Sequence, residues 1–121
     1  MNYASRAYAK TAKEVAPPRE LEANLLLQAA AKLQALHDSW NARTASLNEA
    51  LLYNRRLWTV FLDAVIRSDS PLPAQLRENV KTLGAFVLCE TFSMMTKPRQ
   101  KHLENLININ RRIAAGLRSR H

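Results

Sequence analysis

The chain has 121 residues, of which 47% are hydrophobic and 23% charged, so we expect one folded domain rather than a disordered chain. It contains only two glycines, and this scarcity argues against an all-β fold, whose tight hairpins usually need glycine. The formal net charge is +8, so an acidic molecule is a natural partner.

The first segment, residues 1–17, is rich in Tyr, Ala and basic side chains. It is predicted to form a short helix or an arm that precedes the folded domain at 18–121. Residues 1–13 are too polar for the apolar core of a signal peptide. The apolar runs of the chain fall short of the roughly 20 residues that a membrane span needs. These observations predict a cytoplasmic protein.

Prolines separate the periodic segments that follow, at positions where helices are expected to begin. The first helix is predicted from about Pro18 to Trp40, with an apolar stripe wide enough to touch neighbours on two sides. Ser46, followed three residues later by Glu49, is typical of a capping box and predicts the start of a second helix that ends near Arg67. The third and fourth helices are predicted over about 73–96 and 98–117. Four amphipathic helices with short loops pack most simply as an up-down bundle, so the expected fold class is all-α.

Residues that carry catalytic or metal chemistry do not cluster in the sequence. It has no HExxH or CxxC spacing, no glycine-rich phosphate loop, and no pair of carboxylates on one predicted apolar face. We expect surface positions for His37, His102 and His121, and a buried structural thiol for Cys89, the single cysteine. These residues predict a binding protein rather than an enzyme, with no cofactor, metal or small-molecule substrate.

Two asparagines fall where the helical period calls for an apolar residue. Asn54 interrupts the stripe of the second helix, and Asn110 interrupts that of the fourth. A buried amide can fix helix register at a cost in stability, and this interpretation is favoured. The alternative is a polar contact in a groove that receives a partner helix. The two amides are predicted to hydrogen-bond to each other across the bundle.

The positive charge is concentrated at the end of the chain. Residues 97–121 hold seven basic residues and one acidic residue, a net charge of +6. The possible contacts to RNA or to an acidic partner are Arg99, Lys101, Arg111, Arg112, Arg118 and Arg120. No helix-turn-helix, RNA-binding or zinc-finger pattern accompanies them, so a protein partner is favoured over RNA. A solvated tail without a binding role remains an alternative.

Several blocks of the chain carry a more specific signal, and they occur in one order over about residues 1–118. They are residues 3–11, 19–27, 29–30, 53–59, 71–73 with Arg77, Asn79, Leu83 and Gly84, and 106–111 followed by 113–118. Together these blocks resemble the FlaF family of flagellar biosynthesis regulators. The resemblance implies a cytoplasmic protein of alphaproteobacterial flagellar systems that supports flagellin synthesis and secretion. It also implies two partners: flagellin, bound as by a secretion chaperone, and possibly FlbT, a companion regulator that acts on flagellin mRNA.

A binding mechanism follows from this resemblance as an expectation. A hydrophobic groove of the bundle would capture an amphipathic helix of flagellin. The candidate partner-binding residues are Tyr53, Asn54, Trp58, Phe61, Phe86, Phe92, Met94 and Met95. For each aromatic residue and methionine, an ordinary place in the core is the favoured alternative. The alternative function is post-transcriptional regulation, by binding flagellin mRNA directly or through FlbT.

Overall fold

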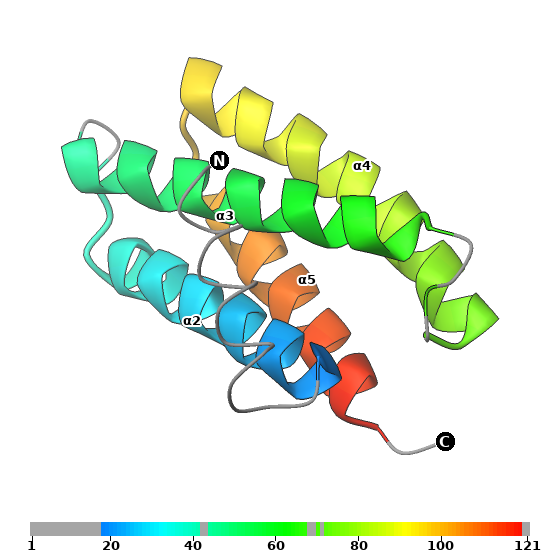
Figure 1. The fold of residues 1–121 in the computed structure, drawn as a ribbon. Helices are drawn as coiled ribbons and strands as arrows, with labels where there is room; N and C mark the ends of the chain where they lie inside the picture. Colours follow the sequence, from blue (N-terminus) through cyan, green and yellow to red (C-terminus); the bar gives the residue numbers. More distant parts are fainter. Residues whose placement is uncertain (1–17, 42–43, 68–69, 71, 120–121) are drawn as a thin grey trace.

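The structure is a computed structural model that describes residues 18–41, 44–67, 70 and 72–119. The predicted N-terminal arm therefore lies outside the described residues. The four helices of the described part are α2 (Pro18–Asp38), α3 (Ala45–Val65), α4 (Ala74–Thr96) and α5 (Gln100–Arg118). Successive helices run in opposite directions (Figure 1), so the predicted all-α bundle with up-down order is confirmed.

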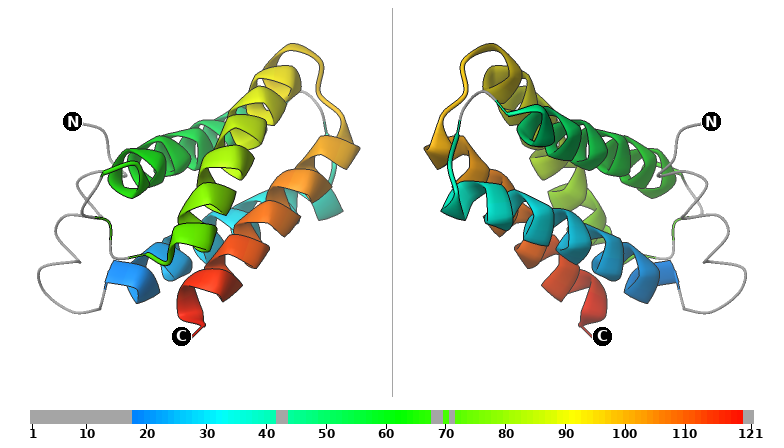
Figure 2. Two further views of the ribbon diagram at one scale, coloured as in Figure 1. Left: turned by 90° about the vertical axis from the view of Figure 1, so that its right-hand side faces the viewer. Right: turned by 90° about the vertical axis from the view of Figure 1, so that its left-hand side faces the viewer.

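The four helices form two layers (Figure 2), one of α2 with α5 and one of α3 with α4. The contact between α2 and α5 is the most extensive in the bundle, and α2 also contacts α3, as its wide apolar stripe predicts. Small side chains make the close approach of α2 and α5 possible, since Ala23, Ala29 and Ala30 of α2 and Ala114 of α5 are buried.

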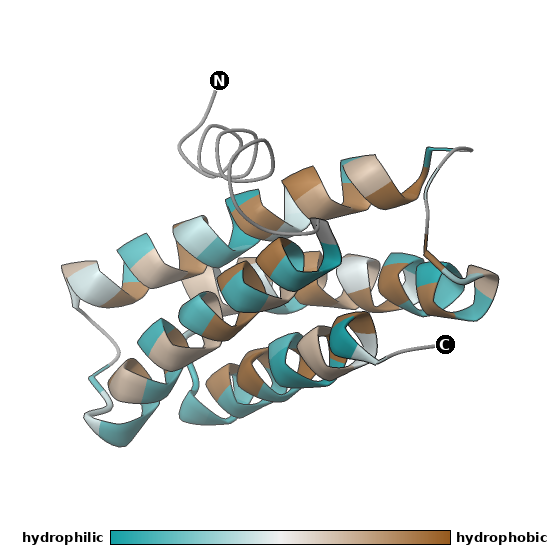
Figure 3. Cartoon of the chain, turned by 60° about the horizontal axis from the view of Figure 1, so that its bottom comes forward, coloured by the Kyte–Doolittle hydropathy of each residue, from teal (hydrophilic) through white to brown (hydrophobic). Residues whose placement is uncertain are grey.

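The core lies between these layers, and Trp58 of α3 is its largest fully buried side chain. Its ring meets that of Phe61 edge to face, with 5.7 Å between the ring centroids. Apolar and polar residues alternate around the helices (Figure 3), as expected for helices that turn one side to a core. Within the described ranges, no helix is both long and apolar enough to cross a membrane.

The helix ends differ from the prediction at one informative place. The N-cap of α3 is Thr44, not Ser46: the backbone of Thr44 is extended, and its Oγ1 accepts a hydrogen bond from the Leu47 amide at 3.2 Å. The predicted capping box at Ser46 is therefore wrong, and Ser46 lies in the first turn of the helix. Thr44 offers the same capping chemistry two residues earlier, so the helix begins at Ala45.

Glycine permits the close approach of α3 and α4. A Cβ atom added to Gly84 would lie only 2.5 Å from Cδ2 of Leu62. Gly116 of α5 has more room, since the nearest atom to its added Cβ would be Cδ1 of Leu76 at 3.2 Å. Gly84 thus sets the packing distance between the two helices of one layer.

Candidate binding surface and its polar core

Asn110 of α5 makes three hydrogen bonds in the centre of the bundle. Its Nδ2 donates to Oδ1 of Asn54 at 2.7 Å and to the backbone carbonyl of Leu26 at 3.2 Å. Its Oδ1 accepts from Nε1 of Trp58 at 2.8 Å. Asn54, Trp58 and Asn110 are each fully buried. The hydrogen bond predicted between the two asparagines is present, and it joins α3 to α5 across the diagonal of the bundle.

This polar core is not fully satisfied on the side of Asn54. Among the described residues, Nδ2 of Asn54 has no hydrogen-bond acceptor. A buried donor without an acceptor costs about 1–3 kcal/mol relative to a paired one. The two amides therefore differ: Asn110 is held by three hydrogen bonds to groups of α2 and α3, whereas Asn54 contributes one acceptor.

The eight predicted partner-binding residues separate into three groups by burial in the structure. Trp58, Phe61 and Met94 belong to the apolar core, and Asn54 to the polar core beside it. A partner would reach these four only if the helices moved apart. Phe86, Phe92 and Met95 are 44%, 69% and 42% exposed, and all three lie on α4. Tyr53 is half-buried on α3, where Nζ of Lys32 lies 4.0 Å from the centroid of its ring.

The outer face of α4 is an exposed apolar surface, made of Ala85, Phe86, Cys89, Phe92 and Met95. By helical spacing, Ala85, Cys89 and Phe92 form its middle, with Phe86 and Met95 on either side. The opposite face of the same helix is buried through Val80, Val87 and Met94. Apolar residues thus occur on both sides of α4, whereas a surface helix of a globular protein usually has a polar outer face.

Charge is almost absent from this part of α4. Glu90 is the only charged residue between Thr82 and Thr96. Its carboxylate is half-buried, contacts Nδ1 of His102 at 2.7 Å and accepts a hydrogen bond from Asn105 at 3.2 Å. Glu90 is therefore engaged with α5 and adds little charge to the outer face.

Cys89 lies in the middle of the outer face and is exposed, so the predicted buried structural thiol is wrong. The prediction rested on the apolar neighbours of Cys89 in the sequence. On α4 these neighbours line both the core and the surface, and apolar surroundings in the sequence do not distinguish the two.

A second exposed feature is a groove of about 620 Å³ between α2 and α3. Its lining combines small and apolar side chains with charged ones at the edge, and consists of Lys32, Ala35, Leu36, Ser46, Glu49, Ala50, Leu52, Tyr53 and Arg56. Of these lining residues, only Tyr53 is among the predicted partner-binding residues. The others lie on two helices and on no common predicted stripe, so their proximity depends on how α2 and α3 pack.

The basic residues of the C-terminal region are exposed but do not form one patch. Lys101 pairs with Glu104 of its own helix at 3.4 Å, and Arg118 donates a hydrogen bond to Asn24 of α2. Arg99 is the N-cap of α5, and Arg111 and Arg112 are exposed further along it. Arg120 lies outside the described residues. The described ones are thus spread over the length of one helix, and Lys101, Arg111 and Arg118 are engaged within the bundle.

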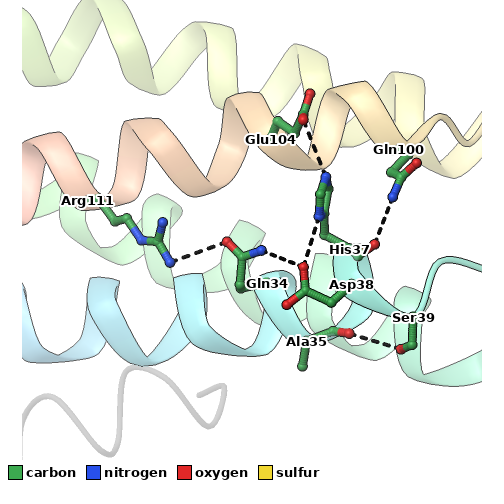
Figure 4. A network of polar contacts seen from close by, with 8 residues as sticks. All are labelled: Gln34, Ala35, His37, Asp38, Ser39, Gln100, Glu104 and Arg111. Carbon is green, nitrogen blue, oxygen red and sulfur yellow. Dashed lines mark hydrogen bonds and ion pairs between the residues drawn. The ribbon is translucent and has the colours of Figure 1, made fainter.

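Polar contacts tie the C-terminal half of α2 to α5 (Figure 4). Gln34 donates to Oδ1 of Asp38 at 2.8 Å and accepts from Arg111 at 3.3 Å. His37 lies 3.4 Å from Glu104, and its backbone carbonyl accepts from Gln100 at 2.8 Å. Hydrogen bonds from Gln34 and His37 lower the pKa of Asp38. These contacts hold two helices together.

The histidines and acids provide no metal site in the described part of the chain, where no three potential ligands come together. His37 and His102 are half-buried, each beside a carboxylate of another helix, whereas a surface position was predicted. His121 lies outside the described residues.

Glu22 of α2 is a buried acid and was not among the predicted site residues. Burial raises the pKa of its carboxyl from 4.5 to about 7, although Arg19 acts in the opposite direction. The side chain lies in a small crevice with apolar residues of α2 and α3, which are Leu25, Leu26, Leu57, Val60 and Phe61. Its spacing from Leu26, Ala29 and Leu33 places it on a buried stripe, and this spacing is the signal that identifies it.

These features define the class of the protein: an all-α bundle of four antiparallel helices with a hydrogen-bonded polar core and an exposed apolar outer helix. The family model described as flagellar protein FlaF matches residues 4–117, and the chain belongs to this family. The resemblance found in the sequence is thereby confirmed, and the protein is a flagellar protein. Neither the curated proteins nor the solved structures contain a match.

Proposed function

We propose that this protein is a non-catalytic, cytoplasmic flagellar protein that binds flagellin as a secretion-chaperone-like partner. The observation that carries the proposal is the outer face of α4, where Phe86, Phe92 and Met95 are exposed on a helix whose other face is already buried. Exposed aromatic residues and methionine are enriched where proteins bind one another. Membership of a flagellar family makes flagellin the first partner to consider.

The physical mechanism is helix capture. Flagellin termini are amphipathic helices that are disordered before assembly, and they need an apolar surface to become ordered. The outer face of α4 offers such a surface with little charge to desolvate. Burial of apolar area at about 25 cal/mol per Å² would offset the loss of chain entropy when the flagellin helix forms.

Isothermal titration with full-length flagellin and with flagellin that lacks either terminus tests this proposal. We expect binding to full-length flagellin and its loss with one of the truncations. Phe92→Ser removes the most exposed aromatic side chain of the face, and we expect it to weaken binding about tenfold or more, as for a hot-spot aromatic residue. Ile66→Ser is the matched control, since Ile66 is 60% exposed but follows α3, away from the outer face.

RNA binding is the outcome that would overturn the proposal. Affinity for RNA falls steeply with salt, by about 10³-fold or more between 50 and 200 mM for a protein that makes several phosphate contacts. Burial of apolar area depends far less on salt. Absence of binding to any flagellin, together with tight and salt-sensitive binding to the leader of flagellin mRNA, would favour the post-transcriptional role. Binding only in the presence of FlbT would favour regulation through that protein.

A further inference from the structure

The groove between α2 and α3 lies apart from the outer face of α4 and has a composition of its own. Its volume is about 620 Å³. Its lining comes from the C-terminal half of α2 and the N-terminal half of α3. Two antiparallel helices therefore bound it on either side, and this shape suits a third helix.

The apolar part of the groove is made of short side chains with longer ones beside them. Ala35 and Ala50 present little bulk, and Leu36 and Leu52 extend the apolar surface. Small residues let another helix approach to the usual 8–10 Å between axes. A helix with apolar residues at i, i+3 and i+4 would place its side chains against the leucines and its backbone near the alanines.

The charged part of the groove determines which helix fits. Lys32 and Arg56 are exposed cations in the lining, and Glu49 is the one carboxylate there. The ammonium group of Lys32 is held 4.0 Å from the centroid of the Tyr53 ring, so its position is fixed at the wall of the groove. Two cations and one acid leave an excess of positive charge beside an apolar surface. A second copy of the chain would bring the same excess to the groove, and like charges disfavour that pairing.

We propose that the α2–α3 groove is a second docking surface, which takes an acidic amphipathic helix of another protein. Apolar side chains of that helix contact Ala35, Leu36 and Ala50, and its carboxylates meet Lys32 and Arg56. The protein then carries two separate surfaces, one neutral on α4 and one basic between α2 and α3. This proposal is independent of flagellin binding by α4.

The probe is a synthetic amphipathic peptide of about 18 residues, long enough to form a helix when bound. One version carries Leu and Ala on one face and Glu on the other, and the control version carries Lys in place of Glu. Amide chemical shifts of the full 121-residue chain report where the peptide binds. We expect the Glu peptide to shift the amides of Ala35, Leu36, Ala50 and Tyr53, and the Lys peptide to bind about tenfold more weakly or not at all.

Matched variants separate the two surfaces. The double substitution Lys32→Glu and Arg56→Glu should weaken binding of the Glu peptide about tenfold. Lys81→Glu, at an exposed cation of α4, should leave the affinity for this peptide unchanged. Ala35→Trp fills the groove and should abolish peptide binding. Ala85→Trp, at an exposed alanine of the outer face, should weaken the binding of flagellin and leave the binding of the peptide unchanged. Thermal melts of each variant show that it folds.

Three outcomes would overturn the inference. In the first outcome, the Glu peptide produces no chemical shift changes even in large excess. In the second, it shifts only amides on the outer face of α4. In the third outcome, the groove amides would shift with protein concentration before any peptide is added, which would make the groove a contact between two copies. Loss of flagellin binding in Ala85→Trp has no effect on these readouts, so the two proposals fail separately.

Discussion

The side chain of Asn110 joins three helices at one point of the core. Asn110 belongs to α5, and it forms hydrogen bonds with Asn54 and Trp58 of α3 and with the backbone of Leu26 in α2. Buried amides that bridge helices in this way specify one register, since any shift along a helix axis breaks all of the bonds together. The polar core therefore selects one packing of the bundle rather than adding much net stability.

The two asparagines are predicted to respond differently to replacement by leucine, whose side chain has the same branched shape. Asn110→Leu leaves Nε1 of Trp58 and the amide of Asn54 without partners, and we expect it to lower the free energy of unfolding by about 3 kcal/mol. Asn54→Leu removes a group that already has an unpaired donor, and Asn110 keeps its bonds to Leu26 and Trp58. We expect a clearly smaller loss, or a gain. Urea denaturation with an unchanged m-value measures both, and an equal loss in the two variants would contradict this account.

The sequence predicted the asparagine pair but not its partners. Two polar residues on apolar stripes predict a shared hydrogen bond, because a buried amide needs a partner wherever the helices meet. The roles of Trp58 and of the Leu26 carbonyl depend on rotation and register between helices, which no single-helix pattern contains. Glu22 lay on the same kind of stripe, and its burial shows that a charged side chain there need not mark the solvent face.

At the scale of elements, the close contact between α3 and α4 depends on Gly84. Gly84→Ala would gain helix propensity of up to about 1 kcal/mol, but the new Cβ would overlap with Leu62. We expect the steric overlap to outweigh the gain in helix propensity, with a net loss of about 1–2 kcal/mol in the free energy of unfolding. Gly116→Ala is the matched control, because its 3.2 Å contact with Leu76 needs only a small adjustment, and we expect no loss.

A double-mutant cycle locates the cause of that loss. Leu62→Ala removes the atoms that the new Cβ would meet, so Gly84→Ala should become neutral or stabilising in the Leu62→Ala background. Thermal or urea unfolding of the four proteins gives the coupling energy. Additive effects of the two substitutions would show that Gly84 matters for another reason.

The existence of all four helices was predictable, because proline positions and a 3.6-residue period mark each of them. The inward face was predictable for α5, whose apolar residues form one stripe with Asn110. For α4 the same period predicts an inward stripe through Val80 and Val87, which are buried, but the helix is apolar on both sides and the pattern leaves its last inward residue open. Phe92 and Met94 are two residues apart and look alike in composition, yet one is 69% exposed and the other fully buried. For such a helix only its contacts with neighbours decide which side is free.

At the scale of the whole molecule, charge and apolar surface occupy different places. The excess of basic residues near the C-terminus predicted contacts to RNA or to an acidic partner, but these residues extend along α5, and Lys101, Arg111 and Arg118 bond within the bundle. The exposed apolar residues gather instead on α4, in the other layer. The net charge can be counted from a sequence, whereas a surface patch of basic or apolar residues depends on which helices are neighbours.

The stability of the whole bundle is predicted to depend on pH through Glu22. Burial raises the pKa of this carboxyl to about 7 in the folded protein, against an ordinary value of 4.5. The folded state thus favours the protonated acid, so the contribution of Glu22 to stability is fully present below pH 4.5 and is lost as the pH rises through about 7. The difference between the two pKa values corresponds to about 3 kcal/mol.

Glu22→Gln keeps the shape of the side chain and removes its ionisation. Relative to the unsubstituted protein, we expect the variant to have a similar free energy of unfolding at pH 4.5 and one about 3 kcal/mol higher at pH 8. Urea denaturation of both proteins across this pH range measures the difference in the free energy of unfolding. A difference that does not change with pH would mean that Glu22 is solvated in the folded protein. Glu20→Gln is the control, since Glu20 is an exposed acid of the same turn. If this variant gained stability at pH 8 as Glu22→Gln is expected to do, the pH dependence would not come from Glu22.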